Sequence, residues 1–306
     1  MILERIKALI DINNLTLKLD NKNILKNINL KIKEGKIYGL IGQNGVGKTS
    51  LIKCLTGIYE VTEGEILYDG FNVYNSPEVK SNIAYVADEN SFFTSFMVKD
   101  IIKYFKYAYK KFNQDKFNNI NEVFKIDIKK RLFQLSKGQK MRVFLMLAFA
   151  LEPKYMILDE PTSGLDPILK NKLLELLKKE AKERNTTIVI SSHHLNELEK
   201  ICDEVAILKD GQVCYKNSLE VIEKSVKKIQ AAFDIPVYEE DLNLPGVFKI
   251  SHVGRVFTII TEQYDEEFTR QLSKFKPLFV EEIDLNLEDL FIYKVQEDDE
   301  YNEEVI

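Results

Sequence analysis

Residues 42–49 read Gly42-Gln43-Asn44-Gly45-Val46-Gly47-Lys48-Thr49 and fit the pattern G-x-x-x-x-G-K-[ST]. In this pattern the glycines let backbone N–H groups curl around phosphate oxygens. The lysine, here Lys48, reaches the β- and γ-phosphates, and the Thr49 hydroxyl holds Mg²⁺. We therefore predict a phosphate-binding loop, with residues 42–49 and the adjoining Ser50 as phosphate ligands and Thr49 also as a metal ligand.

The motif requires a strand before the loop and a helix after it, and the sequence has both patterns. Residues 36–41 read as a short buried strand, and residues 48–56 read as a helix that Gly57 is placed to stop. Further strands are expected at residues 155–158 and 187–190. Strands that alternate with helices predict a mostly parallel sheet with right-handed crossovers.

The remaining elements predict an insertion and an appendage. Asp166-Pro167 gives an N-cap and a first-turn proline for a helix that runs to about Arg184. Residues 91–151 read as a helical, aromatic-rich insertion with no strand. After Gly211 we expect a hairpin around Gly254, a helix in 264–275 and a strand in 278–285. The predicted domains are a main domain at 8–215, a small α+β domain at 216–295 and an acidic, disordered tail at 296–306.

The composition is that of an ordinary soluble globular protein. Of 306 residues, 45% are apolar and 30% charged, and the net charge of −5 argues against a broad nucleic-acid surface, so no nucleic-acid partner is expected. The three cysteines, Cys54, Cys202 and Cys214, fit neither a zinc site nor a disulfide framework, and we expect reduced thiols in a cytosolic protein.

No segment reads as a membrane span or a signal peptide. The longest apolar run, residues 143–151, follows Arg142 directly, whereas a spanning helix needs about 20 apolar residues. The first ten residues, MILERIKALI, carry three charged side chains among the apolar ones.

Acidic and imidazole side chains follow the other two predicted strands. Asp159 stands at the carboxyl end of one strand, where a carboxylate that binds Mg²⁺ belongs, and Glu160 is placed to polarise a water for attack on the γ-phosphate. His193 follows the strand at 187–190, on the same sheet edge, and can donate a hydrogen bond to that phosphate. His194 and His252 are treated as ordinary polar residues.

A second candidate anion site lies far downstream, in the segment LFQLSKGQKMR at 132–142. Ser136 can cap the apolar helix that follows, and Gly138 permits close approach to its first turn. Free N–H groups at a helix start favour an anion. One chain with two such sites requires an explanation.

Four segments in one order resemble the nucleotide-binding cassette of ABC transporters, and the resemblance covers about residues 10–215. They are the loop at 42–49, LSKGQ at 135–139, ILDEPTSGLD at 157–166 and SSH at 191–193. The resemblance implies an α/β fold, a P-loop NTPase cassette with a mostly parallel sheet and a helical subdomain at about 91–151. It also implies two cassettes that pack head to tail, each signature segment capping the γ-phosphate held by the other.

By this analogy Ser136, Gly138 and Gln139 contact ATP held by Lys48 of a partner cassette, and Asp166 signals across the interface. Each chain then contributes half of each site, which accounts for the second anion site. The implied cofactors are ATP and Mg²⁺, and the implied partner is a homodimeric copy or a related subunit.

Three positions depart from the family pattern. Leu19 stands where an aromatic residue usually stacks on adenine, so base stacking is weaker or comes from elsewhere. Asp88 stands where a glutamine is usual, and as a shorter side chain its reach to Mg²⁺ or the attacking water is in question. Lys137 replaces a glycine of the L-S-G-G-Q signature.

The resemblance implies an ATP-hydrolysing subunit that powers transport through a separate membrane permease, at the cytoplasmic face of the membrane. The C-terminal segment EIDLNLEDLFIYKV, at 282–295, is similar to the tail of single-cassette export ATPases for drugs, antibiotics or peptides, although an importer would carry the same cassette. The alternative is a soluble ABC ATPase that clamps a macromolecular partner. Five aromatic side chains at the permease-facing surface of the family are expected mostly to fill the core: Phe92, Phe93, Phe96, Tyr104 and Phe105.

Overall fold

The computed structural model describes residues 8–89 and 92–291 and divides the chain into two compact units, residues 1–216 and 217–306. The sequence prediction placed a domain boundary between residues 215 and 216. The first ten residues fall mostly outside the described ranges, and the acidic tail at 296–306 lies wholly outside them.

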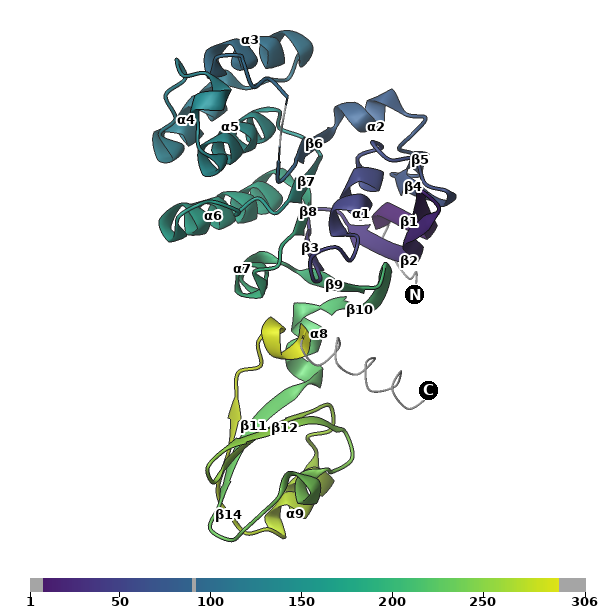
Figure 1. Cartoon of the computed structure of the whole chain (residues 1–306), viewed down its shortest axis with the longest axis vertical. Coiled ribbons are helices and arrows are strands. Elements are labelled where there is room, and N and C mark those ends of the chain that lie inside the picture. The colour runs from purple at the N-terminus through teal and green to yellow at the C-terminus, as the bar shows by residue number, and fades with distance from the viewer. Residues whose placement is uncertain (1–7, 90–91, 292–306) are drawn as a thin grey trace, which may run out of the picture. The chain divides into compact units, whose positions relative to one another are not determined.

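A six-stranded sheet forms the centre of the first unit, in the order β10-β9-β3-β8-β7-β6 (Figure 1). Its pairs β9/β3, β3/β8, β8/β7 and β7/β6 are all parallel, which confirms the predicted parallel sheet. The strands are β3 (Ile37–Ile41), β6 (Ile83–Val86), β7 (Tyr155–Asp159), β8 (Thr187–Ser191), β9 (Glu204–Lys209) and β10 (Gln212–Ser218).

The inner strands of this sheet are buried on both faces. Every residue of β3, β7 and β8 is buried, as expected of the continuous apolar runs that parallel strands form. Helix α1 (Lys48–Leu55) covers one face, and α6 (Pro167–Arg184) lies on the other, where Asp166 caps it as predicted (Figure 1). Two shorter helices are α2 (Pro77–Ser81), which contacts β6, and α7 (Leu195–Ile201), which contacts α6 and β3.

A separate antiparallel sheet, which the sequence interpretation did not foresee, packs on the α1 side of the core. Its order is β2-β1-β4-β5, from β1 (Ala8–Leu19), β2 (Lys22–Lys33), β4 (Glu63–Tyr68) and β5 (Phe71–Asn72). Register shifts interrupt the β1–β2 pairing, and Asn14 and Asn27 have φ of 48° and 51°. These irregularities break the apolar–polar alternation by which such strands are recognised.

Strand β7 is anchored at its first residue. The Tyr155 hydroxyl donates a hydrogen bond of 2.6 Å to Oδ2 of Asp69, and its ring meets Tyr68 edge to face at 4.7 Å between centroids. Both tyrosine rings belong to the buried core that joins the two sheets. The amino end of β7 is therefore fixed to the antiparallel sheet.

Residues 92–151 form the predicted helical insertion, with α3 (Val98–Ala108), α4 (Gln114–Phe124), the short 3₁₀ segment η1 (Leu132–Gln134) and α5 (Lys137–Ala150). Helix α3 buries Val98, Ile101 and Ile102, whereas Tyr104 lies outside that buried face and is 54% exposed. Phe92 and Phe96 are also exposed. The expectation that most aromatic residues here fill the core is therefore wrong.

The second unit is a small α+β fold with its own core. Its sheet has the order β12-β13-β11-β14, with β11 (Lys227–Phe233), β12 (Val247–Val253), β13 (Val256–Thr261) and β14 (Pro277–Ile283), all paired antiparallel. The helices are α8 (Leu219–Ser225), η2 (Glu239–Leu242) and α9 (Glu266–Ser273). The predicted hairpin, helix and final strand are confirmed, and Phe233, Phe257 and Phe268 lie at the centre of the core.

Candidate nucleotide site

Four parallel strands end beside one another and bring many of the predicted side chains to one edge of the sheet. Strand β3 leads into Gly42, β7 ends at Asp159, β8 leads to His193, and β6 leads to Asp88. In parallel sheets the carboxyl ends of the strands share one edge, which is where ligands bind. A cavity of about 230 Å³ there is lined by Asn44, Gly45, Gly47, Lys48, Thr49, Ser50, Asp88, Asp159 and Glu160.

The phosphate loop ends in an open helix start. Gly47 is the N-cap of α1, with φ of 107°, and no side chain caps the helix. A Cβ at this residue would lie 2.8 Å from Cδ2 of Leu25, so both the backbone angle and the packing require glycine. The free N–H groups of the first turn are therefore left for an anion.

Lys48 is the cation inside the cavity. Its Nζ donates to the carbonyl oxygens of Gly42 and Gln43, at 2.7 and 3.1 Å, and lies 3.9 Å from Oε1 of Glu160. Burial lowers the pKa of Lys48, and the carboxylates of Glu160 and Asp159 oppose that shift. The side chain is thus held at the loop by its own backbone, with a carboxylate close by.

Asp159 and Glu160 are positioned by a serine that sequence reasoning missed. Ser191, fully buried at the end of β8, donates from Oγ to Oδ1 of Asp159 at 2.6 Å. The backbone N–H of Glu160 in turn donates to Oγ of Ser191 at 3.1 Å. A hydroxyl residue at the end of a buried strand, in the segment SSH, was the signal that could have identified it.

Glu160 and His193 form a pair at the rim of the cavity. Glu160 has φ of 48°, a left-handed conformation that turns the chain directly after the strand. Its Oε2 lies 2.8 Å from Nδ1 of His193, and since an ionised carboxylate only accepts, the histidine nitrogen is the donor. His193 is half exposed and stands outside the residues that line the cavity.

The oxygen atoms around the cavity suit Mg²⁺. Thr49 offers a hydroxyl, and Asp159 and Asp88 offer carboxylates, all hard donors of the kind that Mg²⁺ prefers. Within residues 8–89 and 92–291, no three His, Cys, Asp or Glu side chains gather closely enough to hold a metal by themselves. Mg²⁺ normally keeps waters and phosphate ligands, so one or two carboxylates suffice. When bound, the ion would neutralise charge on the phosphates.

The signature residues lie elsewhere in the chain. Ser136 caps α5 by accepting from the N–H of Gln139 at 3.3 Å, and Oε1 of Gln139 accepts from the N–H of Ser136 at 3.0 Å. A Cβ on Gly138 would lie 2.0 Å from the carbonyl oxygen of Gly164, so glycine is required by close packing within the chain. None of these residues lines the cavity beside Lys48.

Two other predicted site residues also stand away from this cavity. Leu19, at the end of β1, is partly buried and packs against the core together with Ile24 and Val46. Asp166 accepts hydrogen bonds from the N–H groups of Ile168 and Leu169, at 3.1 and 3.0 Å, as the cap of α6. In the isolated chain both residues have structural roles.

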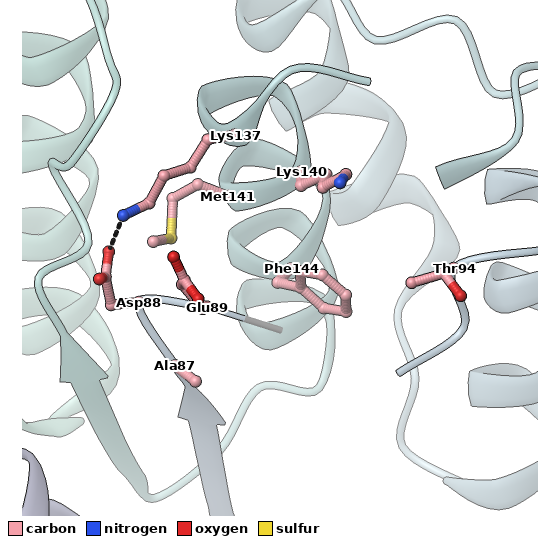
Figure 2. Close-up of a pocket in the computed structure, with 8 residues that line it drawn as sticks. All are labelled: Ala87, Asp88, Glu89, Thr94, Lys137, Lys140, Met141 and Phe144. Carbon is pink, nitrogen blue, oxygen red and sulfur yellow. Dashed lines mark ion pairs between the residues drawn. The ribbon is translucent and has the colours of Figure 1, made fainter. Parts of the chain in front are cut away.

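Asp88 connects the nucleotide cavity with a second one. Its Oδ1 lies 2.7 Å from Nζ of Lys137, at the start of α5 (Figure 2). The second cavity, of about 380 Å³, is lined by Ala87, Asp88, Glu89, Thr94, Lys137, Lys140, Met141 and Phe144. Two of the three departures from the family pattern therefore contact each other.

Comparison with known proteins gives a family match and relatives that cover most of the chain. The family model described as ABC transporter matches residues 25–163. The ABC transporter ATP-binding protein YtrB of Bacillus subtilis (strain 168) is 33% identical over 94% of this chain and 98% of its own length. The bacitracin transport ATP-binding protein BcrA of Bacillus licheniformis is 31% identical over 81% of this chain and 87% of its own.

Solved structures share the fold over about 70% of this chain. An ATP-binding subunit of an ABC transporter is 28% identical with a TM-score of 0.64, and the match covers 71% of this chain and 92% of that one. A dimeric ATP-binding cassette in a post-hydrolysis state, bound to ADP and Pi, is 24% identical with a TM-score of 0.62, over 69% and 98% of the two chains.

Proposed function

Since this chain belongs to the family of ABC transporter ATP-binding proteins, we propose that it powers transport through a separate membrane permease by hydrolysing Mg-ATP at the cavity beside Lys48. Nucleotide binding and ATPase activity follow from the family. The observation that carries the proposal is the gathering of Lys48, Asp159 and Glu160 around one cavity at the strand ends.

The chemistry divides among these side chains. The phosphate loop and Lys48 would hold the β- and γ-phosphates, while Thr49, Asp159 and Asp88 would supply oxygen ligands to Mg²⁺. Glu160 accepts a proton from the attacking water, and it is already oriented by its hydrogen bond to His193. The hydrogen bond from His193 keeps the Glu160 carboxylate near the cavity, while Ser191 positions the buried Asp159.

A second cassette completes the site. ATPases of this family dimerise and work with membrane permease components. In the proposed dimer Ser136, Gly138 and Gln139 of one chain meet the γ-phosphate held by the other, and Asp166 lies at the interface. Support comes from their position: in the isolated chain they do not line the cavity that holds Lys48.

The permease is proposed to dock on the helical insertion. Large aromatic side chains are exposed there, among them Phe92 at 73%, Phe96 at 55% and Tyr107 at 92%, and exposed apolar clusters mark interaction surfaces.

In the described part of the chain, no helix is both long and apolar enough to span a bilayer. We propose a location at the cytoplasmic face of the membrane, and export of an antibiotic, drug or peptide, supported by the similarity to a bacitracin transport protein.

The variant Glu160→Gln tests the base and the shared site together. We expect ATP binding to persist and turnover to fall by about 10²- to 10⁴-fold, because the amide cannot accept the proton. The variant should accumulate as an ATP-bound dimer, measured by sedimentation with and without Mg-ATP. Wild-type turnover by a variant that stays monomeric at saturating Mg-ATP would contradict both assignments.

The permease assignment needs its own experiment. We expect the full-length chain to co-purify with a membrane protein when it is expressed with its neighbouring genes, and we expect Phe96→Ser to weaken that association. Lys110→Ser, an exposed change in the same insertion, serves as the control. Co-purification with a soluble macromolecule instead would favour the alternative of a soluble clamp.

A further inference from the structure

Two side chains that depart from the family pattern form an ion pair within one chain. Oδ1 of Asp88, just after β6, lies 2.7 Å from Nζ of Lys137, the first residue of α5 (Figure 2). The Lys137 side chain is 46% exposed and that of Asp88 is 35% exposed, so the pair is accessible to a competing ligand. The contact joins the rim of the nucleotide cavity to the signature segment.

The charges around the start of α5 are unusual for a helix. The first turn holds Lys137 and Lys140 and no acidic residue, although the positive end of the helix dipole favours anions and disfavours cations there. Asp88 supplies the missing negative charge from another element. Glu89 lines the same cavity, but the ion pair at this position joins Asp88 to Lys137.

The contact is a close pair between an ammonium group and a carboxylate. Oδ1 of Asp88 is buried, and Nζ of Lys137 lies 2.7 Å from it. The charge of Lys137 therefore offsets the burial of this oxygen. A phosphate oxygen carries the same kind of charge and can take the place of the carboxylate beside the lysine.

We propose that Asp88 acts as an internal substitute for phosphate, holding Lys137 until the terminal phosphate of a nucleotide on a second cassette replaces it. The proposal rests on the shared site proposed above. Lys137 is then an additional phosphate ligand supplied across the dimer. Asp88 competes for it, so that closure of the dimer requires an exchange of partners.

The position of Asp88 gives the exchange a second consequence. Asp88 also lines the nucleotide cavity of its own chain, together with Asp159 and Glu160. Once Lys137 leaves, the Asp88 carboxylate is free to turn toward the cation of its own nucleotide. The two nucleotide sites of a dimer would then be linked through one salt bridge in each chain.

The experiment measures the dimer dissociation constant by sedimentation at saturating Mg-ATP, in the Glu160→Gln background. At saturating Mg-ATP every site is occupied, so a change in nucleotide affinity caused by Asp88→Asn does not alter the measured dimer dissociation constant. We expect Asp88→Asn to tighten the dimer about threefold, because it removes the competitor, and Lys137→Met to loosen it by a similar factor. Asp88→Asn combined with Lys137→Met should behave as Lys137→Met alone.

Two control variants separate this exchange from a general effect of charge or folding. Lys137→Arg keeps the cation and should restore most of the dimer affinity that Lys137→Met loses. Lys140→Met changes a lysine in the same helical turn and the same cavity. In this variant Asp88→Asn should tighten the dimer by the same factor as in the parent. The exchange would be overturned if Asp88→Asn did not tighten the dimer. It would also be overturned if Asp88→Asn tightened the dimer in the Lys137→Met variant. Failure of the Glu160→Gln parent itself to dimerise would instead reject the shared site.

Discussion

Helices α1 and α5 both begin at a glycine-containing segment that suits an anion, but their first turns differ. The start of α1 has Gly47 as its N-cap, no capping side chain, and a lysine folded back onto the loop. The start of α5 is closed by Ser136 and Gln139 in a capping box, and Lys137 is already paired with Asp88. One helix start is left open, whereas the other is satisfied by groups of its own chain.

We expect the two anion sites to have different tasks. The open start of α1 should bind a phosphate without losing a capping hydrogen bond, as a primary nucleotide site should. The closed start of α5 should bind one only when Lys137 gives up its pairing with Asp88. Substitutions at the two starts should therefore have effects of different kinds.

The largest effect is expected at the open start. Lys48→Met removes the cation in the cavity, so we expect nucleotide affinity to fall about 10- to 100-fold, which corresponds to the loss of a charged hydrogen bond. Hydrolysis should become undetectable, and a fluorescent nucleotide analogue would measure the affinity. Lys53→Met, in the last turn of the same helix, is the control. Equal losses from both variants would mean that the effect is not specific to the cavity.

A smaller effect is expected from a steric change at the closed start. Gly138→Ala places a Cβ against the carbonyl oxygen of Gly164, so α5 or the 164 loop must shift. We expect a loss of about 1–3 kcal/mol in the free energy of unfolding, measured by denaturant titration. Lys140→Ala in the same turn should lose much less. An unchanged midpoint for Gly138→Ala would show that the packing between these segments relaxes freely.

The smallest effect is expected from the cap itself. Ser136→Ala removes the hydroxyl that accepts from Gln139, which should cost about 1 kcal/mol of folding free energy. Ser136→Thr keeps the hydroxyl and should be close to wild type in thermal denaturation. A loss as large as that of Gly138→Ala would indicate that Ser136 makes a further contact, whereas no loss would mean that the capping bond contributes nothing.

Much of the fold was readable from the sequence because its signals were local. The phosphate loop, the cap at Asp166 and the hairpin around Gly254 each depend on a few adjacent residues, and the structure has all three features. The antiparallel sheet was missed because register shifts in β1 interrupt the alternation. The buried role of Ser191 and the pairing of Asp88 with Lys137 join residues 32 and 49 positions apart, respectively. No local pattern reports such contacts.

The anchored strand β7 sets a limit on how the site can move. Its first residue, Tyr155, is tied to Asp69 and Tyr68, and its last, Asp159, is tied to Ser191, so five residues span two fixed points. We therefore expect any rearrangement during turnover to begin after Asp159, where Glu160 has a left-handed backbone. Asp159, the proposed metal ligand, would then keep its position while the segments around it move.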